Sequence, residues 1–138
     1  MTELSINEID ALATKAARGA GFSWGLAEEV AQSARWLASH GLAWDGLLLK
    51  LLEHGGTPSG SEPVIDGAAV RPTAATGLLC PVRLGAYWSD SGAPAGLAAT
   101  RVHTPVFVIP ALVRALAGSK ERRTLSWPGI TVEIGPGT

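Results

Sequence analysis

Cysteine is almost absent from this 138-residue chain, which contains only Cys80. A single cysteine excludes an intramolecular disulfide, and the first residues have neither the basic start nor the apolar run of a signal peptide. The longest apolar runs are far shorter than the roughly 20 residues that span a bilayer. We therefore expect a cytoplasmic protein without a membrane partner.

Charge is also scarce, and the two signs nearly cancel. The 11 Lys and Arg and 12 Asp and Glu give a net charge of −1, which offers no electrostatic reason to expect nucleic acid as a partner. No stripe of further Lys or Arg residues extends the basic cluster Lys120–Arg123, and we interpret it as a solvated loop. Because only 17% of residues are charged and 46% are hydrophobic, we expect a partner to cover part of the surface, either in a homo-oligomer or in a complex with another protein.

Short metal-ligand spacings are missing as well. The three histidines and the cysteine are far apart in the sequence, so we expect neither a metal site nor another cofactor. Cys80 lies in the apolar stretch Leu-Leu-Cys-Pro-Val, where a buried, unreactive thiol is the ordinary outcome.

The N-terminal half contains three predicted helices. Ser5 and Glu8 have the spacing of a capping box, so a first helix should run from about Ile6 to Arg18. Ser23 can accept amide hydrogens at the start of a second helix, which should stop at Gly41. These signals favour two helices joined by a tight corner.

A third helix is expected from Asp45, as its N-cap, to Gly55. It has more leucines than one amphipathic face can hold, so we expect the helix to be buried on several sides or to join a subunit interface. These leucines are Leu47, Leu48, Leu49, Leu51 and Leu52.

The sequence pattern of the C-terminal half is typical of β-structure. We expect a short hairpin around Asp66-Gly67, strands at 78–88 and 101–109, a short helix at 111–117, and a final hairpin. The strands of that last hairpin should be Thr124–Trp127 and Ile130–Ile134, flanking Pro128-Gly129.

These elements predict an α+β fold, with a helical N-terminal half and a mostly antiparallel C-terminal half that holds one short helix. We expect a single domain over 1–138, made of a helical lobe (1–56), a linker (57–63) rich in Gly, Pro and Ser, and a β-rich lobe (64–138).

The run Gly19–Gly25 has the spacing GxGxxxG and follows a predicted helix. A dinucleotide-binding fingerprint has another spacing and follows a strand, so we interpret the run as a helix–helix corner. Phosphate binding at the start of the second helix is the alternative.

Ser39 and His40 are the candidate catalytic residues. Neighbours on a helix point about 100° apart, so we expect them not to form a nucleophile–base pair. We interpret His40 as a helix C-terminal cap, with a ligand or proton-transfer role as the alternative.

Tryptophan is frequent, with five among only eight aromatic residues. Large amphipathic side chains of this kind anchor cores or interfaces. Core packing is expected for most of them, and an interface or a small-ligand pocket involving Trp24, Trp44 or Trp88 is the alternative.

The motif NEI…KAARGAG..WGLAEE…RWL, between Ser5 and Leu37, resembles a family of uncharacterised bacterial proteins of unknown function. A second pattern is similar to the N-terminal segment of the malate/L-lactate dehydrogenase family. It consists of Ala27–Ala31, Ser39-His-Gly41, the leucine-rich helix, Gly55-Gly56 and Val64–Gly67.

In the dehydrogenase family the histidine of the Ser-His-Gly motif lies at the substrate site, which implies His40 here, with Ser39 beside it. The arginine expected shortly afterwards is replaced by Leu42–Asp45, and the chain ends before a nicotinamide-binding region could be completed. The resemblance therefore implies an incomplete relative, or a subunit that needs a partner.

Two functional hypotheses follow. The first is a non-enzymatic binding or assembly subunit that acts as a homo-oligomer. The second is a dehydrogenase-like oxidoreductase, or a subunit of one, with His40 near a carboxylate substrate. The second gains support if His40 lies in a cleft facing Arg35, Arg71 or Arg83.

Overall fold

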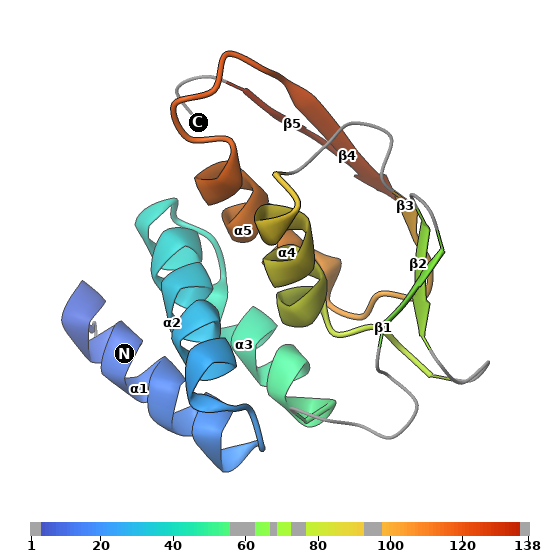
Figure 1. Ribbon diagram of the computed structural model, residues 1–138. Coiled ribbons are helices and arrows are strands. Elements are labelled where there is room, and N and C mark those ends of the chain that lie inside the picture. Colours follow the sequence, from blue (N-terminus) through green and yellow to red (C-terminus); the bar gives the residue numbers. More distant parts are fainter. Residues whose placement is uncertain (1–3, 56–62, 67–68, 73–76, 93–97, 136–138) are drawn as a thin grey trace.

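The computed structural model describes residues 4–55, 63–66, 69–72, 77–92 and 98–135, and its fold is α+β (Figure 1). The helices are α1 (Ile6–Gly19), α2 (Trp24–Ser39), α3 (Trp44–Glu53), α4 (Pro81–Asp90), the 3-10 helix η1 (Pro105–Phe107) and α5 (Val108–Ala115). The strands are β1 (Pro63–Asp66), β2 (Ala69–Pro72), β3 (Ala98–Ala99), β4 (Arg123–Trp127) and β5 (Ile130–Ile134).

Helix α2 lies at the centre of the helical layer. It contacts α1, α3, α4 and α5, while the strands form the outer edge beyond α4 and α5 (Figure 1). Small buried side chains on α2, including Ala27, Ala31 and Ala34, let these neighbours approach closely. The α4–α5 pair is also tight, since a Cβ added at Gly85 would stand 2.8 Å from the Ala111 Cβ.

The strands form two small sheets. In the first, β1 pairs antiparallel with β2, and β2 pairs in parallel with β3. In the second, β4 and β5 form an antiparallel hairpin that joins Trp127 to Ile130 across the turn. The α+β class is confirmed, and the first sheet is mixed rather than purely antiparallel.

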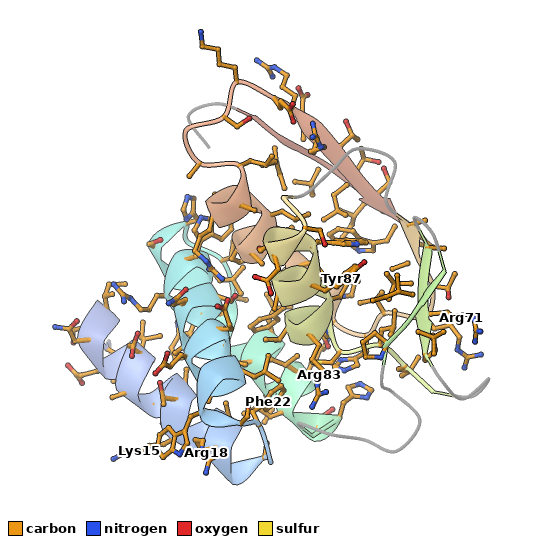
Figure 2. The ribbon with its side chains drawn as sticks, in the orientation of Figure 1. Lys15, Arg18, Phe22, Arg71, Arg83 and Tyr87 are labelled. Atoms are coloured by element: carbon orange, nitrogen blue, oxygen red, sulfur yellow. The ribbon has the colours of Figure 1, made fainter. Side chains whose placement is uncertain are left out.

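The start of the chain folds as the sequence predicts. Ser5 Oγ accepts the Glu8 N–H at 3.2 Å, which completes the capping box of α1. At the α1–α2 corner Gly21 has φ +98°, and Phe22 N–H donates to the Ala17 carbonyl at 3.0 Å. Phe22 is fully buried there, whereas Lys15 and Arg18 lie on the outer side (Figure 2).

The predicted N-cap of the third helix is wrong by two residues. Helix α3 begins at Trp44, and its N-cap is Ala43, whose side chain makes no capping bond. Asp45 instead lies in the first turn and accepts the Gly46 N–H at 2.9 Å. Its charge still suits the positive end of the helix dipole.

The strand predicted at 78–88 is wrong, because most of it forms α4. Pro81 occupies the first helical turn, where its missing N–H costs nothing. Pro81, Leu84 and Trp88 are buried at helical spacing, a period that the apolar run conceals.

The strand predicted at 101–109 is wrong as well. Its first residues form bends that lead into η1, and α5 then begins at Val108 rather than at Ala111. The C-terminal half therefore holds two α-helices, not one. Both predicted hairpins are confirmed, although Gly67 at the first turn and the linker residues 57–62 lie outside the described residues.

Candidate functional site

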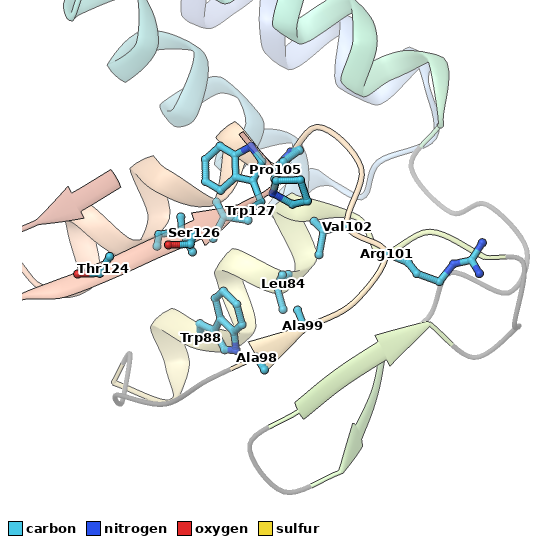
Figure 3. Close-up of a pocket in the computed structure, with 13 residues that line it drawn as sticks. Leu84, Trp88, Ala98, Ala99, Arg101, Val102, Pro105, Thr124, Ser126 and Trp127 are labelled. Atoms are coloured by element: carbon cyan, nitrogen blue, oxygen red, sulfur yellow. The ribbon is translucent and has the colours of Figure 1, made fainter. Parts of the chain in front are cut away.

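A partly enclosed cleft of about 530 Å³ lies between α4, β3 and the β4–β5 hairpin (Figure 3). Apolar side chains dominate its walls, among them Leu84, Trp88, Ala99, Val102, Leu125 and Trp127. Figure 3 shows Trp88 from α4 and Trp127 from β4 among the residues that line the cleft. The volume falls within the range of small-molecule sites.

Among the described cleft residues, Trp88 carries the one buried side-chain N or O atom that has no hydrogen-bond partner. Its side chain is only 5% exposed, and its Nε1–H is buried without a hydrogen-bond partner. A buried donor left in this state costs about 1–3 kcal/mol. The nitrogen lies on the side of the ring toward Ala98, which is itself a cleft residue (Figure 3).

The segment that forms one wall of the cleft is held in an unusual backbone conformation. Arg101 and Thr104 both have positive φ, +60° and +42°, which is rare for residues other than glycine. Two hydrogen bonds to Leu79 hold the segment. The Leu79 N–H donates to the Arg101 carbonyl at 2.7 Å, and the Leu79 carbonyl accepts the His103 N–H at 3.1 Å. Val102 is thereby placed in the cleft wall.

His103 is buried just behind this wall. Its ring stacks on that of His54, at the end of α3, with 3.9 Å between ring centroids. Its Nδ1 lies 3.2 Å from Thr104 Oγ1, and its Nε2 is buried without a partner. Burial and, to a lesser extent, the charge of His54 lower the pKa of His103 to about 4.

Ser39 and His40 lie closer together than their helical neighbourhood predicts. His40 is the C-cap of α2, outside the regular helix, and its Nδ1 stands 3.2 Å from Ser39 Oγ. The same Nδ1 is 2.7 Å from the Trp36 carbonyl oxygen. Because a carbonyl can only accept, Nδ1 carries the hydrogen and does not act as a base toward Ser39.

The surroundings of His40 also suit a structural role. The ring is exposed and stacks on Trp36 with centroids 3.9 Å apart. Arg35, the nearest cation in the sequence, forms an ion pair with Asp10 at 3.3 Å. His40 therefore caps α2, as one of the two interpretations of the sequence predicts.

The three candidate tryptophans have different environments. Trp24 is 65% exposed, and the Arg18 guanidinium lies over its ring at 4.4 Å. Trp44 is half-buried against the core of the helical lobe. Only Trp88 lines the cleft, and it is joined there by Trp127, which the sequence does not single out.

In the described part of the chain, no group of three or more His, Cys, Asp or Glu side chains is arranged to hold a metal ion. Cys80 is buried at the N-cap of α4, and this burial raises the pKa of its thiol. Across the same residues, no helix combines the length and apolar character needed to cross a membrane.

The lowered pKa of His103 predicts a pH-dependent contribution to stability. Because the folded-state pKa, about 4, lies below the unfolded value of 6.5, the unfolded chain binds more protons between these values. This contribution is present above pH 6.5 and is lost as the pH falls toward 4, by up to about 3 kcal/mol. Urea unfolding of wild type and His103→Gln from pH 7.5 to 4 measures it.

The free-energy difference between wild type and His103→Gln should shrink as the pH falls through this window. His40→Gln, at the exposed cap of α2, serves as the matched control for the loss of a histidine elsewhere in the chain. A difference between wild type and His103→Gln that stays constant from pH 7.5 to 4 would contradict the burial of a neutral imidazole.

Comparison with known proteins identifies a family that the N-terminal part of the chain matches. A family model described as protein of unknown function (DUF3726) matches residues 4–78, the segment from the start of α1 to just before α4. No curated protein and no solved structure matches the chain. The described cleft residues all lie beyond the matched segment. Since the match covers more than half of the 138 residues, the chain belongs to this DUF3726 family of proteins of unknown function.

Proposed function

We propose that this protein is a non-enzymatic binding protein that acts as a homo-oligomer and holds a small, largely apolar molecule in the cleft between α4 and the β4–β5 hairpin. The observation that carries the proposal is the cleft itself, with about 530 Å³ of space and two tryptophans among its lining residues. A cleft of this size, lined mostly by apolar residues with a few polar groups, is the usual form of a small-molecule site.

The side chains of the cleft support binding rather than catalysis. Among the described residues that line it, none is a His, Cys, Asp, Glu or Lys. The polar side chains there are the hydroxyls of Thr124 and Ser126, the indoles and the Arg101 guanidinium, and Figure 3 shows Arg101 directed away from the other labelled residues. General acid–base chemistry at neutral pH needs a group that titrates near pH 7, and these side chains do not.

The oxidoreductase alternative would require His40 to face a carboxylate substrate in a cleft. Its ring instead stacks on Trp36 at the end of α2, and His40 is not part of the cleft described above. Arg35 is engaged with Asp10. No contact of His40 favours this alternative, and we give preference to the binding function.

Exposed apolar side chains in the helical lobe support the homo-oligomeric state. Trp24, Leu49 and Leu12 are 65%, 62% and 49% exposed. Leu49 lies on α3, whose leucines exceed what one buried face requires, since only Leu48 and Leu51 are buried there. Side chains of this size gain free energy when a second copy removes them from water.

Filling the cleft should abolish binding of an apolar probe. Ala99→Phe places a ring in the cavity, and we expect it to weaken the binding of the uncharged dye Nile red by at least about tenfold, because about 1.4 kcal/mol of contact is lost. Fluorescence titration measures this, and Ala11→Phe on the exposed side of α1 is the size-matched control. Equal dye affinity in wild type and Ala99→Phe would contradict the cleft as the binding site.

The oligomeric state has a direct test. Sedimentation equilibrium at micromolar concentration should give a mass clearly above the 14.2 kDa of one chain. Lysine in place of Leu49 should lower this mass if α3 takes part in the interface, because a charge would then be buried. A strictly monomeric wild-type protein would contradict the homo-oligomer while leaving the cleft untouched.

A further inference from the structure

The Trp88 indole gives the cleft a chemical preference that its apolar walls alone do not. A buried donor without a partner is rare, because it carries a free-energy cost relative to a satisfied one. A bound molecule that supplies an acceptor to Nε1 recovers that cost, whereas a hydrocarbon of the same shape does not. The cleft should therefore discriminate between ligands by their acceptor.

The charged side chains of the cleft indicate whether the ligand's hydrogen-bond acceptor is charged or neutral. None of the described lining residues carries a carboxylate or an amine, and Figure 3 shows the Arg101 side chain turned away from the Trp88 side. A cation would be desolvated there without a counter-ion, and an anion would have only the outward-directed Arg101, so either charge would be desolvated at a net cost. A neutral acceptor such as a carbonyl oxygen avoids that cost.

The aromatic and flat surfaces of the cleft indicate the shape of the ligand. Trp88 and Trp127 supply indole rings, and aromatic rings gain free energy from stacked or edge-to-face contacts beyond the burial of their area. Ala98 and Ala99 add only methyl groups on the wall that β3 forms. A planar ring compound fits these surfaces better than a branched or flexible one.

Access to Nε1 requires a small local movement, because the atom is covered in the ligand-free protein. The neighbouring strand β3 has only two residues, and it pairs with β2 through Ala69–Ala98 and Val70–Ala99. A short edge strand with methyl side chains can shift at little energetic cost. An entering acceptor then reaches the indole nitrogen.

We infer that the cleft binds a neutral, planar ring compound whose carbonyl oxygen accepts the hydrogen of Trp88 Nε1. This inference rests on the binding function proposed above and adds the chemical class of the ligand. Trp88 is then the residue that determines specificity, and Trp127 contributes apolar contact to any ring that enters.

Two flat probes of similar size separate the contribution of the acceptor to the binding affinity from the contribution of the ring. Coumarin carries a carbonyl oxygen, and naphthalene carries no acceptor. Their dissociation constants are measured for wild type and for Trp88→Phe, which keeps an aromatic ring and removes the N–H. We expect the preference for coumarin relative to naphthalene to fall about tenfold in Trp88→Phe, the value of one buried hydrogen bond. Trp127→Phe, in the same cleft, should weaken both probes together.

A spectroscopic readout on the wild-type protein does not depend on the variant folding. The Trp88 indole ¹H–¹⁵N signal should move downfield with coumarin and not with naphthalene. If both probes bind and neither the affinity ratio nor this signal responds to the acceptor, the inference is overturned and the binding function stands. If neither probe binds the wild-type protein, both the inference and the cleft as a binding site are overturned.

Discussion

The close packing of α2 against four other helices is the constraint on which the rest of the structure depends. Alanines at three buried positions of α2 allow this, since larger side chains would push α1, α4 and α5 outward. Small residues also allow close packing between α4 and α5, where Gly85 faces Ala111. Trp88 of α4 is buried in a cluster that contains residues of α5 and of the strands.

The cleft arises where the helical layer ends and the small sheets begin. β3 has only two residues and β4–β5 is an isolated hairpin, so neither sheet covers α4 completely. The bends at 101–104, with two residues at positive φ, bring the chain from β3 back to α5 around this gap. A strained connection beside a cavity is a common feature of ligand sites. The low charge of the chain fits such a site and also fits association between copies.

Local signals account for the elements that the sequence predicts well. The capping box at Ser5 and the alternation in Ile130–Ile134 both depend on residues a few positions apart, and the structure confirms both elements. The 78–88 stretch is different, because a short apolar run with a proline fits a buried helix and a buried strand equally well. Its packing against α5, a long-range contact, decides the outcome.

The candidate site depends even more on long-range contacts. Trp88 can be singled out as a possible ligand contact from residue type alone, but its partner Trp127 comes from a hairpin distant in the sequence. The His54–His103 stack joins the end of α3 to the wall of the cleft and has no local sequence signal at all. Helix capping, in contrast, is local, and so the interpretation of His40 as a cap follows directly from its position before Gly41.

A crystal structure of the protein with bound coumarin would show directly which group the ligand contacts. We expect one coumarin in the cleft between α4 and the β4–β5 hairpin, with its carbonyl oxygen within about 3.2 Å of Trp88 Nε1. A coumarin whose carbonyl points to solvent or to the Ser126 hydroxyl, with a water molecule on Trp88 Nε1, would contradict it.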